Sequence, residues 1–208
     1  MKFLLAMLGA AVFLLSDTGL AGVLLAGSLG SGSFSFRPQG QELTPNYLGF
    51  TPGLALGYSY KQHLDTVLFG EYTFAGFERF ARPTQASLIF AGAQVAARFK
   101  GVTMGLRGGW AQYHLLRVND VLEEIPGEWR GTGGGFFMGS LLQLAKKHYL
   151  QIAFEYNQLA VKPLVNKAVL GPSGRTIDQV MITVTYTFNE FINYLIGNTL
   201  FESIIKDI

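Results

Sequence analysis

The chain has 208 residues, of which 49% are hydrophobic and only 14% are charged, with a formal net charge of +2. Since a water-soluble domain carries roughly 25% charged residues, this chain has too few charges to cover a surface that faces water on all sides. The small net charge gives no support for nucleic acid as a partner, and the absence of cysteine excludes a disulfide framework, a thiolate nucleophile and cysteine-ligated zinc.

Residues 1–21 are typical of a secretory signal peptide. Lys2 provides a basic start, and residues 3–15 form an apolar run that is shorter than the roughly 20 residues of a membrane-spanning helix. We expect cleavage after Ala21, with Ala26 as the second choice, and a single N-terminal membrane anchor is the alternative. No later apolar run is long enough for a spanning helix.

Alternation of large apolar residues with small or polar ones predicts β-strands through the rest of the chain, because successive side chains of a strand point to opposite faces. In one such stretch, Leu54 and Leu56 alternate with Ala55 and Gly57. The same period predicts eight strands, at residues 24–36, 48–60, 66–79, 85–99, 102–116, 133–145, 149–161 and 177–188.

The connections between these strands alternate in length. Those after the second, fourth and sixth strands are short and basic, whereas the longer polar ones span residues 37–47, 117–132 and 162–176. This order predicts an antiparallel up-and-down meander with short turns at one end.

Two arrangements fit such a meander. A soluble, lipocalin-like barrel places its apolar residues inside, whereas a membrane barrel turns them toward lipid. The small-residue face favours the membrane barrel, because glycine, alanine, serine and threonine cannot cover a soluble exterior and an eight-stranded lumen holds few bulky side chains. We therefore predict an all-β fold, an eight-stranded antiparallel transmembrane β-barrel that leaves no unpaired edge in lipid.

Aromatic residues lie near the predicted strand ends, as in the two girdles of a membrane barrel. At the short-turn end they are Tyr58, Tyr60, Phe99, Tyr149, Tyr186 and Phe188, and at the long-loop end they are Tyr72, Phe74, Phe80, Trp110, Tyr113 and Tyr156.

Residues 22–188 resemble the small eight-stranded outer-membrane β-barrels of Gram-negative bacteria, such as the transmembrane domain of the OmpA type and OmpX. The resemblance implies a place in the cell outer membrane, among its lipid and lipopolysaccharide, and insertion by the barrel-assembly machinery. The sequence VTYTF resembles the C-terminal signal that this machinery recognises. The resemblance implies that Val184, Tyr186 and Phe188 are the recognition residues.

Charged and amide residues on the predicted inward face form a candidate lumen network of Glu71, Gln94, Arg98, Arg107, Gln143 and Glu155, with Asn157, Asp178 and Gln179 beside them. Ionisable groups at membrane depth usually face the interior and pair with one another. We therefore expect ion pairs that close the lumen, and a structural, envelope-stability or surface-interaction role. A narrow path for small ions is the alternative, since eight strands leave no broad channel.

No sequence motif predicts an enzyme, a cofactor or a metal site. His114 has lipid-facing parity near the long-loop end of the fifth strand, where outer-membrane lipid A deacylases carry a histidine and a serine. The chain has HLLR at residues 114–117 rather than the His-x-Ser-Asn motif of that family, and GTGGG at 131–135 lacks the Lys-Ser/Thr of a phosphate-binding loop. A barrel enzyme that modifies lipid A or phospholipid is therefore kept only as an alternative.

Two features lie outside the predicted strands. Trp129 is expected in the long loop, where it either contacts a partner or packs on the rim. Residues 189–208 do not alternate and are expected to form a short helical tail on the periplasmic side. That tail could lie on the membrane, cap the barrel or hold a periplasmic partner.

Overall fold

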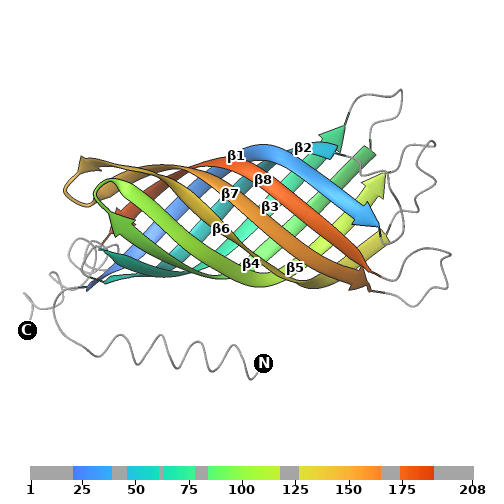
Figure 1. The fold of residues 1–208 in the computed structure, drawn as a ribbon, viewed down its shortest axis with the longest axis horizontal. Helices are drawn as coiled ribbons and strands as arrows, with labels where there is room; N and C mark the ends of the chain where they lie inside the picture. The colour runs from blue at the N-terminus through green and yellow to red at the C-terminus, as the bar shows by residue number, and fades with distance from the viewer. Residues whose placement is uncertain are drawn as a thin grey trace, which may run out of the picture.

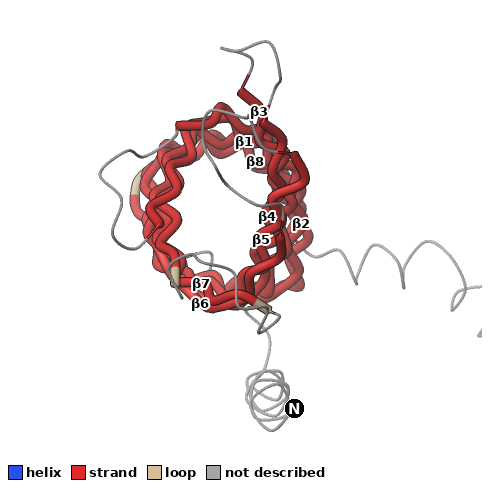
Figure 2. The backbone as a smooth tube through the Cα atoms, turned by 90° about the vertical axis from the view of Figure 1, so that its right-hand side faces the viewer, coloured by secondary structure: helices blue, strands red, loops and turns tan. Residues whose placement is uncertain are grey.

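Eight antiparallel strands close into a barrel in sequence order, so that β1 pairs with both β2 and β8 (Figure 1). The computed structural model describes residues 21–38, 46–60, 63–77, 84–117, 127–164 and 174–189. The strands are β1 (Ala21–Pro38), β2 (Asn46–Tyr60), β3 (Leu64–Phe77), β4 (Thr84–Phe99), β5 (Val102–Arg117), β6 (Gly127–Ala145), β7 (His148–Pro163) and β8 (Arg175–Asn189). Viewed end-on, the strands form one closed ring (Figure 2).

The register around the ring determines the tilt of the strands. Following paired residues from Ser28 once around the barrel leads back to β1 at Pro38, which is ten residues farther along (28 to 38). A stagger of this kind tilts the strands by roughly 40° to the barrel axis, and the oblique strands are plain in Figure 1. Residues that meet across the lumen are therefore far apart in sequence.

The eight predicted strands are confirmed, and only the sixth differs much in extent. β6 begins at Gly127, six residues before the predicted start at residue 133. The glycines of residues 131–135 hide the alternation in the sequence, although they lie within the wall and pair with β5 and β7.

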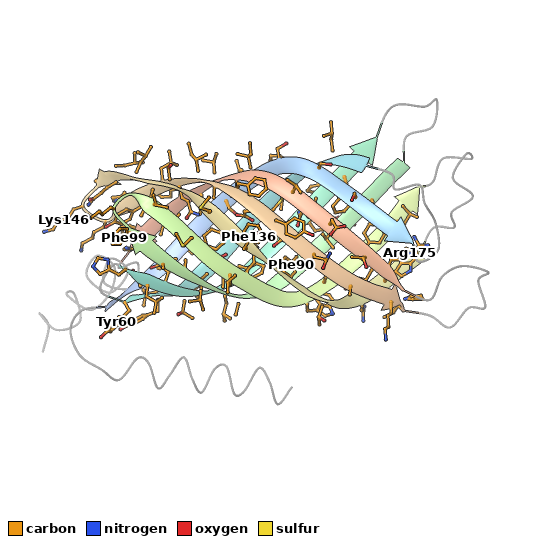
Figure 3. All side chains as sticks on the ribbon, viewed as in Figure 1. Tyr60, Phe90, Phe99, Phe136, Lys146 and Arg175 are labelled. Carbon is orange, nitrogen blue, oxygen red and sulfur yellow. The ribbon has the colours of Figure 1, made fainter. Side chains whose placement is uncertain are left out.

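Large apolar side chains cover the outer wall, as predicted. Leu48, Leu54 and Leu106 are 73%, 70% and 70% exposed, and side chains project outward along the whole barrel in Figure 3, where the labelled Lys146 and Arg175 stand at opposite ends. An exterior of this composition fits lipid rather than water. No helix in the described part of the chain is long and apolar enough to cross a membrane.

Some predictions of side-chain direction are wrong. Tyr113 and Tyr149, expected in the aromatic girdles, have the same parity as the lumen residues of their strands and are 0% and 7% exposed. Asp178 lies on the outward parity of β8, not the inward one. Phe80, expected in a girdle, the predicted signal peptide up to residue 20 and the predicted tail from residue 190 lie outside the described residues.

Candidate functional site

Arg107 on β5 stands at the centre of the lumen between two carboxylates. Its Nη2 is 2.6 Å from Oε1 of Glu71 on β3, and its Nη1 donates to Oε2 of Glu155 on β7. Oε1 of Glu155 also accepts a hydrogen bond of 2.7 Å from the Thr183 hydroxyl of β8. The guanidinium carbon lies 4.0 Å from the centre of the Phe69 ring. One buried cation thus joins strands that are not neighbours in the sheet.

Glycines beside Arg107 let the neighbouring parts of the barrel pack closely. Gly135 is its register partner on β6, and a Cβ at Gly135 would lie 2.0 Å from the backbone oxygen of Tyr156. A Cβ at Gly105 would lie 2.5 Å from the Phe137 ring. Since Cβ atoms do not approach other atoms this closely, close packing requires glycine at both positions.

A second ion pair lies nearer the short-turn end. Nε of Arg98 on β4 is 2.6 Å from Oδ2 of Asp65 on β3, and both side chains are buried. The guanidinium carbon lies 5.0 Å from the centre of the Tyr149 ring. Asp65 was not among the predicted lumen residues, because the predicted strand begins at residue 66, whereas β3 already begins at Leu64. Asp65 has the same parity as Glu71 on β3, and this shared parity could have identified Asp65 as a lumen residue.

A cavity lies between these two ion-paired levels. Polar side chains of Gln94, Gln151 and Thr185 contribute to its lining, together with the carboxylates of both levels. Asp65 Oδ1 and Glu71 Oε2 also lack a hydrogen-bond partner among the described residues. Buried polar atoms in such a position are usually satisfied by ordered water, so this part of the lumen is suited to hold water.

On the other side of Arg107, uncharged polar residues cross the lumen. Gln179 of β8 accepts from Asn157 Nδ2 of β7 at 3.1 Å and donates to Thr73 Oγ1 of β3 at 3.1 Å. The Thr73 hydroxyl lies 2.9 Å from that of Thr51 on β2. These contacts extend the polar connection from β7 and β8 to β2 and β3.

Large apolar side chains fill the lumen toward the long-loop end, which the sequence analysis did not predict. The Tyr113 ring centre lies 6.2 Å from that of Phe34 and 5.5 Å from that of Trp129. The whole apolar layer comprises Phe34, Phe69, Ala75, Ala86, Leu88, Phe90, Ala111, Tyr113, Leu115, Trp129, Leu159, Val161 and Ile177. Ion pairs and other polar contacts therefore fill only part of the lumen, and apolar packing fills the rest.

Two residues of the predicted lumen network, and Asp178 predicted beside it, do not contact Arg107 or its two carboxylates. Gln94 is half-buried and lines the cavity. Gln143 is exposed at the end of β6 and donates to the Lys146 backbone oxygen at 3.5 Å, so its place in the network is wrong. Asp178 accepts a hydrogen bond of 2.8 Å from Tyr156 Oη on the outer wall.

Trp129 does not lie in a surface loop, so that prediction is wrong as well. β6 extends back to Gly127 and includes it, and its odd parity turns it into the lumen, where it is 6% exposed. The guanidinium carbon of Arg175 lies 4.2 Å from the centre of its ring.

The predicted assembly signal occupies the outer face of β8 near the short-turn end. Val184 and Tyr186 are 43% and 45% exposed. His148, at the start of β7, contacts the Tyr186 hydroxyl through Nδ1 at 2.5 Å and stacks on the Phe188 ring with centres 4.9 Å apart. Recognition of these side chains by the assembly machinery stays a prediction.

His114 lies on the outer wall near the long-loop end of β5. Its Nε2 is 3.4 Å from Oε1 of Glu128 and 2.6 Å from Nε2 of Gln112. Ser87 on β4 is its register partner, but no hydroxyl of a described residue is hydrogen-bonded to the ring, as a histidine-activated serine nucleophile requires. Within the described strands and turns, no three histidine, aspartate or glutamate side chains gather as metal ligands.

Comparison with known proteins identifies the class of fold. No family model and no curated protein matches the chain. Among solved structures, Neisserial surface protein A matches with a TM-score of 0.59 and 13% identity, over 84% of this chain and 100% of that one. Ail, the attachment invasion locus protein of Yersinia pestis, matches with a TM-score of 0.47 and 14% identity, over 79% and 98%. The chain therefore has the fold of the small eight-stranded outer-membrane β-barrels, and the predicted outer-membrane fold is confirmed.

Proposed function

We propose that this chain is an integral outer-membrane protein with a closed lumen and a structural, envelope-stability or surface-interaction role. The observation that carries the proposal is the bridge from Glu71 through Arg107 to Glu155, with the apolar layer packed beside it. The apolar outer wall supports a position in membrane lipid beside lipopolysaccharide, where the barrel-assembly machinery would insert it.

The filled lumen argues against the alternative of an ion channel. A passing ion would have to separate a buried ion pair, which costs several kcal/mol. It would then have to cross a layer in which Leu88 and Tyr113 are 0% exposed, and an apolar constriction of this kind excludes hydrated ions.

Planar-bilayer recording tests the closed lumen. The refolded protein is expected to give no stepwise conductance above that of bare membrane, while a general porin reconstituted in the same way conducts. Arg107→Ala is also expected to stay silent, because the apolar layer remains in place. Steady conductance of the wild-type barrel would overturn the closed lumen.

The envelope role needs a cellular measurement. Deleting the gene from its host is expected to increase the uptake of a dye that an intact outer membrane excludes, and to reduce attachment if the surface role dominates. Restoration by the wild-type gene would support the proposal. An unchanged barrier together with unchanged attachment would contradict it.

A further inference from the structure

The charges at the two ion-paired levels of the lumen do not balance. Three carboxylates, those of Asp65, Glu71 and Glu155, face two guanidiniums, those of Arg98 and Arg107. Asp65 pairs with Arg98 alone, so the excess lies at the other level, where Arg107 stands between two carboxylates. Among the described residues, this level therefore has one negative charge more than it has positive charges.

The other described cations lie too far away to balance this charge. Arg175 is inside the barrel, but its guanidinium stacks on Trp129 in the apolar layer, beyond the polar part of the lumen. The remaining cations are on the outer wall or in the short turns, at Lys100, Arg130, Lys146, Lys147 and Lys162. Because an uncompensated buried charge is costly, a further positive charge is favoured beside Arg107.

The excess charge can be assigned to one oxygen atom. Both oxygens of Glu155 have partners, Oε2 in Arg107 and Oε1 in the Thr183 hydroxyl. Glu71 uses Oε1 for Arg107, at 2.6 Å, whereas its Oε2 has no hydrogen-bond partner among the described residues. The Glu71 side chain is only 9% exposed and lines the lumen cavity. A buried carboxylate oxygen is thus available to a ligand in this cavity.

Neutral oxygen donors line the same cavity beside Glu71. One row of register partners leads from Glu71 across Gly53 to Ser28, Thr185 and Gln151, and these three also contribute to the cavity lining. A Cβ at Gly53 would lie 2.5 Å from Ser28 Oγ and 2.8 Å from Glu71 Cγ, so the hydroxyl and the carboxylate side chain converge over this glycine. Carboxylate, hydroxyl and amide oxygens are the ligands that hard cations prefer.

We infer that the lumen cavity binds one monovalent metal cation, sodium or potassium, at Glu71 Oε2. A single positive charge balances the excess, whereas a divalent ion would reverse it and usually binds several carboxylates. The ion enters from the short-turn side, where Leu24 and Thr187 line the cavity near the strand ends, because the apolar layer closes the other side. The inference rests on the proposed closed lumen, in which the ion is held rather than conducted.

Thermal unfolding of the refolded protein in a non-ionic detergent tests the inference. The loss of β-sheet circular dichroism is followed on heating, with enough urea to bring the midpoint into range. Sodium chloride and potassium chloride are compared with the chloride of N-methylglucamine, a bulky organic cation, at equal ionic strength. Since a ligand that binds only the folded state stabilises it, we expect the midpoint to be roughly 5 °C higher in a saturating concentration of the bound metal ion.

Three variants locate the ion. Glu71→Gln keeps the shape of the side chain and removes the excess charge, so its midpoint should be the same in all three salts. Ser28→Ala removes a neutral oxygen and should reduce the difference between salts. Glu128→Gln is the matched control, because it removes a carboxylate from the outer wall, where Oε1 of Glu128 lies 3.0 Å from Nη2 of Arg130. This control should depend on the salt as the wild-type protein does.

The outcomes separate a metal ion from a proton. Midpoints of the wild-type protein that are equal in the three salts overturn the inference. If they also fall with rising pH in the wild-type protein but not in Glu71→Gln, a proton balances the charge instead. A salt dependence that persists in Glu71→Gln places the ion elsewhere and also overturns the site. If Glu71→Gln does not fold, Ser28→Ala decides, and an unchanged salt dependence in that variant overturns the site. None of these results affects the closed lumen, which is tested by conductance.

Discussion

At the scale of single residues, Arg107 has two carboxylate partners in a nearly inaccessible site. Arg107→Ala would leave Glu71 and Glu155 uncompensated, which destabilises a protein by about 3–5 kcal/mol. We expect the folded gel band of this variant to convert to the unfolded band at a lower temperature. Arg130→Ala, at an exposed pair, should change it little. A conversion temperature equal to that of the wild-type barrel would contradict a stabilising role for Arg107.

Gly135 offers a second test at this scale. Gly135→Ala places a Cβ 2.0 Å from a backbone oxygen of β7, so the wall must shift and we expect a lower yield of folded barrel in detergent. Gly70→Ala is the matched control, since nothing lies within 4 Å of its added Cβ. Equal refolding yields for the two variants would show that the wall adapts at no cost.

Strand parity was enough to predict Glu71, Arg98, Arg107 and Glu155 as lumen residues, because charges at membrane depth turn inward. Which of these residues pair with one another could not be predicted. Which residues meet across the lumen depends on the ten-residue stagger of the register, and alternation within one strand contains no information about stagger.

At the scale of whole elements, seven strands start within three residues of the predicted positions. The start of β6 was predicted too late, because glycine has no side chain and therefore marks neither face of a strand as large or polar. Trp129 was misplaced for the same reason, since the glycines of residues 131–135 separate it from the recognisable part of its strand.

The directions of the two tryptophans test the assignment of faces. Trp110 is 40% exposed on the outer wall and Trp129 is 6% exposed in the lumen. In bilayers of brominated lipid, Trp129→Phe, which retains Trp110, should show strongly quenched fluorescence, and Trp110→Phe should be quenched much less. Equal quenching would mean that β5 or β6 has the wrong face toward lipid.

β8 contains the predicted assembly signal, and its role can be separated from stability. Tyr186→Ala/Phe188→Ala is expected to lower the amount of protein in the outer membrane of cells while leaving refolding of the purified chain largely unchanged. Ile182→Ala, a 63% exposed outward position on the same strand, is the control and should accumulate normally. Equal cellular levels of the two variants would contradict a recognition role.

At the scale of the whole molecule, the lumen is filled in two different ways. Ion pairs and the cavity occupy the part toward the short turns, and the apolar layer occupies the part toward the long loops. The apolar layer was not predicted, because Leu88 and Phe90 have the same parity as the lumen residue Arg98. With large residues on both faces of a strand, the alternation that indicates the two faces is no longer visible. Only the closed ring shows that the lumen has room for them.

The central claim is that this chain is a closed barrel embedded in the outer membrane. The most direct measurement combines carbonate extraction of isolated outer membranes with gel electrophoresis of heated and unheated samples. We predict that the protein stays in the membrane pellet and that its mobility changes on heating, because a closed barrel resists detergent unfolding until it is heated. A protein released by carbonate, with the same mobility heated or unheated, would contradict the account.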